Sequence, residues 1–363
     1  MGALISSSPA NGNSSHRIEM MSELYNQSCH TQLEVHKLAY VDLTKSVQQA
    51  CLRRNDALYS VVDFGSAGGL NSLQLMNSVT NLFDDTLCKN SNHQLAMTFT
   101  DLPSSDNNEL ITTLSSSPLF SVKERKKQFF SVIGRSFYEQ CLPSNSVDLS
   151  LSYITLHWLQ SQHLTIPSSH VMVHESGVSA GVKKLWAMQA HADLVCFLQQ
   201  RAYELKSGGS GVYVSTGGGG THDLALPSSW DQLPNHNGMS VPTLAISRMI
   251  DDGNFDESDT ADAKLLRAKV GFYRRAPAEI EKAIADVSGL ELHNIVEKQF
   301  TFDKDLNETF DLFWSIHEAS LTSSMNLSTS ETAMLKDYCM DVFEEELYDG
   351  SMIPYISFRV VKS

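Results

Sequence analysis

The stretch that decides the fold is Tyr59-Ser60-Val61-Val62-Asp63-Phe64-Gly65-Ser66-Ala67-Gly68-Gly69-Leu70-Asn71. It opens with a short apolar run rich in Val, which is typical of a buried strand and ends at Asp63 and Phe64. Three glycines within residues 65–69 predict a tight turn, and residues 71–82 resume the spacing of a helix. The stretch therefore predicts a strand, a tight turn and a helix in direct succession.

The same alternation continues along the chain. Further strands are expected at 95–100, 128–133, 147–153 and 211–216, with helices at 31–54, 71–82, 106–114 and 182–205, the last of them ended by Ser207-Gly208-Gly209. Strands that alternate with helices imply parallel pairing, helices on both faces of the sheet, and a ligand at the carboxyl ends of the strands. The predicted fold class is α/β, with a sheet of the Rossmann type.

The second half of the chain is expected to be mostly helical. Helices are predicted at 241–250, 277–287, 307–321 and 330–347, and strands at 290–300 and 355–361 return to the sheet. We expect a disordered tail over 1–16, a Rossmann-like core over 17–216, a mostly helical cap over 217–350, and a final core strand within 351–363. The four glycines at 217–220 predict a flexible crossing into the cap, because no helix begins close behind them.

Composition excludes several classes of partner. The chain has 363 residues, 42% of them hydrophobic, which is enough for one large core. Lys plus Arg number 27 against 42 Asp plus Glu, and a net charge of -15 would repel a nucleic acid. The six cysteines form no Cys-x-x-Cys pair, and no apolar run reaches the roughly 18 residues that span a bilayer. A cytoplasmic location with reduced thiols is expected.

The N-terminal segment carries one weak targeting pattern. Met1, Gly2 and Ser6 match the permissive pattern for N-myristoylation. A single acyl chain binds membranes only marginally. We favour a disordered tail, with no stable membrane anchor, although the sequence leaves modification of Gly2 open.

Two carboxylates mark a nucleoside site. Asp63 and Asp101 end successive predicted strands, and the glycine turn lies between them. A carboxylate at the end of the second strand can accept both ribose hydroxyls, while Gly65 and Gly68 allow close approach of the backbone. The pattern alone also fits an NAD-dependent dehydrogenase. It departs from Gly-x-Gly-x-x-Gly, however, and Asp101 follows Asp63 by 38 residues rather than about 20, which favours S-adenosyl-L-methionine (SAM).

A set of ordered motifs adds a family resemblance. The motif at 62–71 is followed by Asp101-Leu102-Pro103, by Ser136-Phe137-Tyr138, and by a strand-like stretch from Ser152 to Leu159 that ends in Trp-Leu. In this order the motifs resemble those of the SABATH family of SAM-dependent carboxyl methyltransferases. The resemblance implies a Rossmann-like class I methyltransferase sheet with SAM as cofactor. It also implies cofactor contacts from Tyr25, Asp63, Gly65, Asn71, Asp101, Leu102, Ser136 and Phe137. Taken alone, Ser136-Phe137-Tyr138 would also fit an ordinary aromatic core.

The acceptor side rests on two hydrogen-bond donors. Tyr25 and Gln32 are seven residues apart, about two helical turns, so they share a face if the segment is helical. The resemblance assigns Gln32 and Trp158 to the acceptor carboxylate, which the amide and indole N–H groups would hold. The glycine-rich lead-in of the family is missing, and Ser28-Cys29 replaces its Asn-Ser pair. A lone Trp158 after a strand would otherwise be interpreted as core.

The remaining acceptor residues differ from those of salicylate-type members. His157 and Phe313 are expected to line the pocket, although His157 also fits a structural role. Ile154 stands in place of a Tyr, and Gly238 and Met239 replace bulkier residues. Cinnamate, indole acetate or a larger terpenoid acid therefore fits as well as salicylate. The metal ligands of some members do not occur at 266–269, so no metal is expected.

The resulting prediction is an O-methyltransferase that forms the methyl ester of a small organic acid by in-line methyl transfer. No catalytic base is needed, because a carboxylic acid with a pKa of about 4 is already ionised at neutral pH. Catalysis should then be mostly positioning. The alternatives are N-methylation of a small heterocycle, as in relatives of the caffeine pathway, and a non-catalytic interaction protein on the same fold. Relatives often form homodimers, so a homodimer is a further expectation.

Overall fold

The computed structural model describes residues 35–53, 58–87, 92–120, 127–160, 164, 166, 170–175, 177–217, 240–254, 268–301, 305–346 and 352–363. Three residues with predicted roles, Tyr25, Gln32 and Met239, lie outside these ranges.

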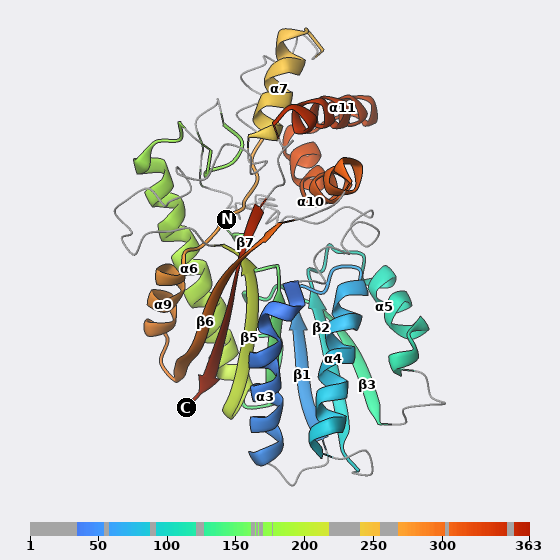
Figure 1. The fold of residues 1–363 in the computed structure, drawn as a ribbon, viewed down its shortest axis with the longest axis vertical. Helices are drawn as coiled ribbons and strands as arrows, with labels where there is room; N and C mark the ends of the chain where they lie inside the picture. The colour runs from blue at the N-terminus through green and yellow to red at the C-terminus, as the bar shows by residue number, and fades with distance from the viewer. Residues whose placement is uncertain are drawn as a thin grey trace, which may run out of the picture.

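A seven-stranded sheet forms the centre of the molecule (Figure 1). Its spatial order is β3 (Gln128–Gly134), β2 (Gln94–Asp101), β1 (Leu58–Phe64), β4 (Val147–Tyr153), β5 (Leu205–Thr216), β7 (Met352–Lys362) and β6 (Leu290–Thr301). Strands β1 to β5 pair in parallel, whereas β7 pairs antiparallel with both β5 and β6. The predicted α/β fold of the Rossmann type is confirmed.

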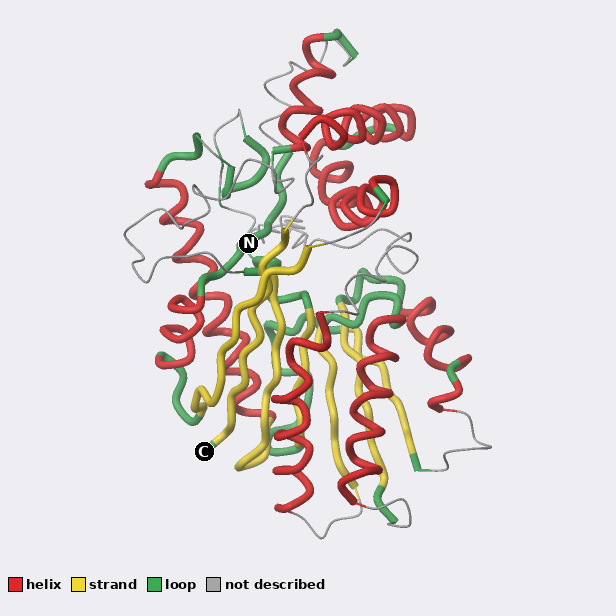
Figure 2. The backbone as a smooth tube through the Cα atoms, in the orientation of Figure 1, coloured by secondary structure: helices red, strands yellow, loops and turns green. Residues whose placement is uncertain are grey.

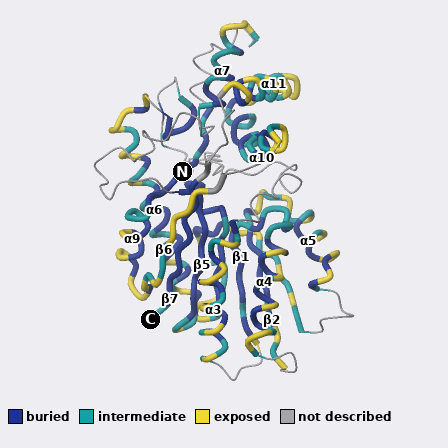
Figure 3. Tube along the Cα trace, viewed as in Figure 1, coloured by how far each residue is buried: buried dark blue, intermediate teal, exposed yellow. Residues whose placement is uncertain are grey.

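Helices cover both faces of the sheet (Figures 1 and 2). On one face lie α3 (Tyr40–Arg53), α4 (Leu70–Leu87) and α5 (Asn107–Ser116), with the short 3-10 turns η2 (Lys37–Ala39) and η3 (Pro118–Phe120). On the other lie α6 (Ala180–Glu204) and α9 (Pro277–Ala285). Because successive strand residues point to opposite faces, Val61 packs in the α3 and α4 layer and Val62 in the α6 layer. The inner strands β1, β2, β4, β5 and β7 are accordingly buried along most of their length, whereas the edge strands β3 and β6 are not (Figure 3).

A second helical layer lies beyond the carboxyl ends of the parallel strands (Figure 1). It consists of α7 (Val241–Asp251), α10 (Leu306–Met325) and α11 (Thr329–Glu346). Helix α10 begins where the Asp305 side chain accepts the Asn307 N–H at 2.8 Å, and it ends at Asn326 in the left-handed conformation. The apolar cluster of this layer also includes Trp158 and Phe272. The segment that follows β4 is therefore packed into the core of this second layer.

One predicted boundary is wrong. The glycine pair at 208–209 does not separate α6 from its strand, because β5 begins at Leu205, directly after the helix. Leu205 pairs with Val147 and Ser210 with Leu149, so residues 206–209 bulge opposite Asp148. Gly208, with φ of +69°, supplies the left-handed turn of the bulge. The Lys206 ammonium reaches the Asp148 carboxylate at 2.6 Å and closes the bulge onto β4.

Two further findings concern membrane-spanning helices and the state of the cysteines. Across the described ranges, no helix is both long enough and apolar enough to cross a bilayer. The cysteines among those residues, Cys51, Cys141, Cys196 and Cys339, are free thiols.

Candidate active site

The turn after β1 is a backbone cradle at the carboxyl edge of the sheet. Gly65, Ala67 and Gly69 all have positive φ, at +84°, +45° and +92°. The N–H groups of Gly65 and Ser66 both donate to the Thr100 carbonyl of β2, at 2.9 and 3.0 Å. A Cβ atom at Gly65 would lie 2.3 Å from the Thr155 methyl carbon, so no side chain fits there. The glycine therefore makes room for the segment after β4 as well as for a ligand.

Asp101 ends β2 beside this turn. Its Oδ2 accepts the Ala67 N–H at 2.6 Å, and its Oδ1 accepts the Leu102 N–H at 2.7 Å and the Ser105 hydroxyl at 2.5 Å. A carboxylate offers about four acceptor positions, so three protein donors leave one, and rotation of the Ser105 hydroxyl frees a second. Two acceptor positions next to a glycine turn fit the ribose diol of an adenosyl group.

Asp63 lies deeper, at the end of β1. Only 3% of it is exposed, and Oδ2 accepts the Ser72 hydroxyl at 2.5 Å and the Ser66 hydroxyl at 2.9 Å. Burial raises the pKa of Asp63 to about 6, against the two serine hydrogen bonds that lower it, and the charge of Asp101 raises it further. Asn71 precedes Ser72 in the first turn of α4. The carboxyl thus fastens the glycine turn to the start of α4.

The loop after β3 meets the same edge. The Arg135 N–H donates to the Asp101 carbonyl at 2.8 Å, which holds the residue before Ser136 at the end of β2. The Ser136 hydroxyl accepts the Tyr138 N–H at 3.3 Å. The Phe137 ring packs toward α6, 5.8 Å from the ring of Phe197. Phe137 is thus part of the core as well as of the loop.

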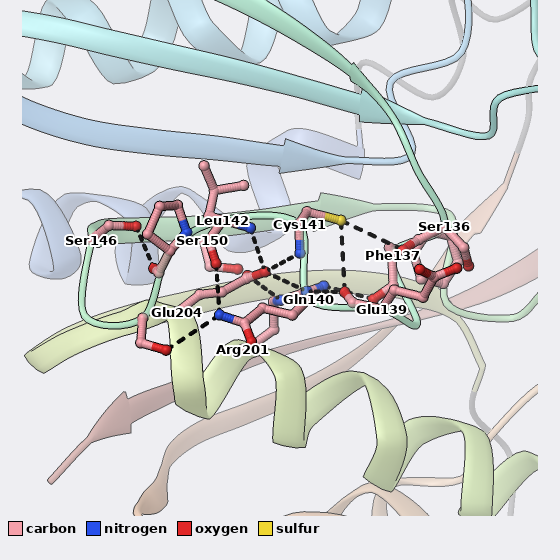
Figure 4. Close-up of polar contacts among 12 residues, drawn as sticks. Ser136, Phe137, Glu139, Gln140, Cys141, Leu142, Ser146, Ser150, Arg201 and Glu204 are labelled. Atoms are coloured by element: carbon pink, nitrogen blue, oxygen red, sulfur yellow. Dashed lines mark hydrogen bonds and ion pairs between the residues drawn. The ribbon is translucent and has the colours of Figure 1, made fainter.

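A buried ion pair on α6 holds this loop (Figure 4). The Arg201 guanidinium donates to the carbonyls of Phe137 and Glu139 at 2.8 and 2.9 Å, and its Nε lies 2.8 Å from the Glu204 carboxylate. Glu204 in turn accepts the N–H groups of Cys141 and Leu142. Arg201 and Glu204 are 0% and 1% exposed. Sequence reasoning missed this pair, although Arg201 continues the apolar stripe of Leu194, Phe197 and Leu198 on the predicted helix.

The segment that follows β4 begins with a residue in a strained backbone conformation. Ile154, the first residue after β4, has φ of +60°. A β-branched residue in this region is an outlier that costs roughly 1–3 kcal/mol and is common at functional sites. Its N–H donates to the Val214 carbonyl at 2.6 Å, which fixes the bend to β5. The bend redirects the chain from the sheet toward Trp158.

Trp158 and His157 are packed against Phe272, a residue that sequence reasoning missed. The Phe272 ring lies 5.8 Å from the Trp158 ring and 4.7 Å from that of His157. Trp158 and His157 are 6% and 2% exposed. Burial, followed by the charges of Arg274 and Arg275 and by His317, holds the pKa of His157 well below its usual range. His157 is therefore neutral at physiological pH.

Helix α10 and the segment before α9 contribute aromatic and basic groups around Phe272. Phe313 lies 4.8 Å from the ring of His317, which itself lies 6.4 Å from Phe272. Burial lowers the pKa of His317 to about 3, and the charge of Arg274 lowers it further. The Arg274 guanidinium is 5.3 Å from the Phe272 ring, and burial lowers its pKa to about 10. A buried cation and two neutral imidazoles thus surround the Trp158 ring cluster, a setting that suits an anion.

The predicted residues therefore fall into two groups. The first group, at the ends of β1, β2 and β3, contains Asp63, Gly65, Asn71, Asp101, Leu102 and Ser136, with Phe137 behind them. In the second group, Ile154, His157 and Trp158 follow β4, and Phe313 on α10 packs against the apolar cluster that includes Trp158. Tyr25, Gln32 and Met239 lie outside the described residues. No three His, Cys, Asp or Glu side chains of the described ranges gather as metal ligands would.

Known proteins show similarities over the chain. A family model described as SAM-dependent carboxyl methyltransferase matches residues 20–356. Methyltransferase LUC1 from Fusarium sp is 35% identical over 178 residues, which are 48% of this chain and 44% of that protein. A benzoic acid/salicylic acid carboxyl methyltransferase (number 2) of Petunia hybrida is 23% identical over 305 residues, 80% of this chain and 76% of that protein. The chain spans about half the length of the first curated relatives that it matches, 44% to 60% of each.

A solved structure extends the likeness to the fold. A loganic acid methyltransferase with SAH superposes with a TM-score of 0.76 at 18% identity, over 96% of this chain and 99% of that one. The two proteins share their fold. Since the family model covers nearly the whole described structure and the predicted SABATH motifs lie together at the strand ends, the chain belongs to the family of SAM-dependent carboxyl methyltransferases.

Proposed function

We propose that this protein methylates the carboxylate of a small organic acid with SAM and forms its methyl ester. The observation that carries the proposal is the placement of Asp101 and Trp158. Asp101 ends β2 with acceptor positions for a ribose, and Trp158 follows β4, on the other side of β1. Ligands of parallel α/β sheets bind at such carboxyl ends.

The cofactor side of this proposal uses the residues of the glycine turn. When bound, SAM supplies an electrophilic methyl group on a sulfonium. Asp101 would accept the ribose hydroxyls, and Ser136 and Leu102 would contact the adenosine. Asp63 and Asn71 would hold the start of α4 beside the methionine moiety, together with Tyr25 and the open backbone at Gly65.

The acceptor side uses neutral donors and one buried cation. The Trp158 indole N–H and the Gln32 amide would hold the carboxylate and aim one oxygen along the line of attack. Burial keeps the His157 imidazole neutral, and its ring N–H can still donate a hydrogen bond to an anion. The buried Arg274 beside Phe272 makes the local field favourable to a carboxylate. The burial of Trp158 and His157 excludes water from this side of the site.

The body of the acid is expected to be apolar. Phe272 and Phe313 offer ring faces, and Ile154 and Met239 complete the predicted pocket. The names of two similar proteins refer to benzoic, salicylic and loganic acids. An aromatic or terpenoid carboxylic acid is therefore the proposed acceptor class.

The test is methyl transfer from radiolabelled SAM to a panel of free acids, with purine amines beside them. The panel contains benzoate, salicylate, cinnamate, indole acetate, farnesoate and loganate. A base-labile radioactive product from one acid supports the proposal. Transfer to an amine alone would replace it with N-methylation, and failure to bind SAM would indicate a non-catalytic protein. The cytoplasmic location and the homodimer stay predictions from the sequence.

A further inference from the structure

Tyr138 connects the two halves of the candidate site. Its hydroxyl donates to the Trp158 carbonyl at 2.5 Å, across 20 positions of sequence. Tyr138 is 4% exposed, and its ring lies 4.6 Å from that of Phe137. One end of the residue therefore belongs to the loop beside the proposed adenosine site, and the other end reaches the proposed acceptor residue.

The loop end is rigidly attached to α6. Arg201 holds the carbonyls of Phe137 and Glu139, the residues on either side of Tyr138 (Figure 4). The Cys196 thiol donates to the Tyr138 carbonyl itself at 3.3 Å. Three consecutive carbonyls thus bond to one helix, so the position of the Tyr138 ring is set by the core.

The Trp158 end lies on a bend that needs support. The Trp158 N–H donates to the Thr155 carbonyl at 3.1 Å, within the same turn. Its neighbours bond to the segment at 271–273, which forms an isolated antiparallel bridge with Trp158 through Phe272. The Leu159 N–H donates to the Gly271 carbonyl at 2.8 Å, and the Tyr273 N–H donates to the His157 carbonyl at 2.9 Å. The turn starts at the strained Ile154. The Tyr138 hydroxyl is the contact that ties the Trp158 carbonyl to the cofactor side.

We infer that Tyr138 is a positioning residue, which sets the Trp158 indole relative to the loop at 136–138. The inference rests on the proposed function for the role of Trp158. Methyl transfer needs the acceptor oxygen in line with the methyl group, and a misplacement of about 1 Å can lower the rate by about 100-fold. A bond from Trp158 to the loop at 136–138, in addition to its contacts with the cap, would hold the acceptor carboxylate at a fixed position relative to the methyl group of SAM.

The test compares Tyr138→Phe with a matched control, Tyr213→Phe. Tyr213 is also fully buried in the α6 layer, and its hydroxyl forms a hydrogen bond of 3.0 Å with Ser150. Each variant removes one buried hydroxyl and keeps the ring. For the wild type and both variants we would measure SAM affinity by calorimetry, kcat and KM for an acid that the panel identifies as acceptor, and backbone hydrogen exchange of peptides covering 155–160.

Tyr138→Phe should leave SAM affinity within about 2-fold, lower kcat/KM for the acid by about 10-fold, and speed exchange at 155–160. Tyr213→Phe should lose about as much thermal stability as Tyr138→Phe, but its kcat/KM for the acid and its hydrogen exchange at 155–160 should stay those of the wild type. Unchanged exchange at 155–160, or kinetics equal to those of Tyr213→Phe, would overturn the inference. If the wild-type protein methylates no acid, the proposed function fails separately, and unchanged exchange would still refute the fixing of Trp158 by Tyr138.

Discussion

The carboxylate of Asp101 accepts a hydrogen bond of 2.6 Å from the backbone N–H of Ala67. The group proposed for ribose recognition therefore also closes the glycine turn, whose residue Ala67 has φ of +45°. The proposed ribose contact and the shape of the glycine turn therefore depend on the same carboxylate.

Replacement of Asp101 by Ala should lower SAM affinity by about 100-fold, because charge-assisted hydrogen bonds contribute about 1.5–3 kcal/mol each. Calorimetric titration with SAM measures the loss. The control is Ser105→Ala, which keeps Asp101 and frees one position on Oδ1, and its affinity should stay within about 3-fold. Unchanged affinity in Asp101→Ala would refute the ribose assignment.

Trp158→Phe should lower kcat/KM for the acid by about 100-fold while SAM affinity stays within about 3-fold, because it removes the indole donor and keeps an aromatic ring. Steady-state kinetics with the acid varied checks this. Trp186→Phe is the control, since Trp186 is a similarly buried indole on α6 with no hydrogen-bond partner for its nitrogen among the described residues. Equal loss of acid turnover in both variants would count against a carboxylate contact.

Arg201→Met should destabilise the protein by about 3–5 kcal/mol, because it leaves the Glu204 carboxylate buried without its partner. It should also weaken SAM binding, since the Phe137 and Glu139 carbonyls lose their donors. Urea unfolding and calorimetry measure the two effects. Arg248→Met breaks an exposed ion pair with Glu345 and should cost less than about 1 kcal/mol. A comparable cost in both variants would argue that the α6 pair is not structural.

His317→Gln should make the protein less sensitive to acid. The pKa of His317 falls from its ordinary 6.5 to about 3 on folding, so its stability contribution is present above pH 6.5 and is lost as pH falls from 6.5 toward 3. At pH 5 the loss is about 2 kcal/mol. Unfolding free energies at pH 7 and pH 5 should therefore differ less in the variant than in the wild type.

Asp63→Asn should change the pH dependence of the unfolding free energy in the opposite direction to His317→Gln. The pKa of Asp63 is raised from 3.8 to about 6, so its contribution is present below pH 3.8 and is lost as pH rises through 6. The Asn variant should lose more stability than the wild type between pH 7 and pH 5. An identical pH response of both variants and the wild type would contradict both shifts.

The sequence predicts those parts of the fold whose pattern is local. Strand β4 has the predicted bounds, Val147–Tyr153, because apolar and polar residues alternate over this stretch and the turn residues of 143–146 precede it. Strand β5 was expected only from Gly211, since Gly208 and Gly209 are typical of a helix end, whereas the structure uses them in a bulge within the strand. The bulge depends on the partner strand, which local propensity does not contain.

The same distinction applies to the candidate site. Asp63 and Asp101 can be found from sequence because each lies at the carboxyl end of a strand, and these ends of neighbouring parallel strands lie side by side. The Tyr138 hydroxyl bonds to Trp158, and the Trp158 ring packs against Phe272. No spacing rule in the sequence connects these residues. Tertiary packing decides these contacts, so they emerge only with the three-dimensional structure.

The position of β7 has a consequence for synthesis on the ribosome. Strand β7 lies between β5 and β6 although both precede it in the chain. The strands that carry Asp63 and Asp101, and the segment after β4 that carries Trp158, can therefore leave the ribosome while the side of β5 that β7 will cover is still open. An open strand edge is prone to pair with other chains. We expect nascent chains that stop before residue 352 to aggregate or to recruit chaperones, even though the segments that carry the proposed cofactor residues have already been translated.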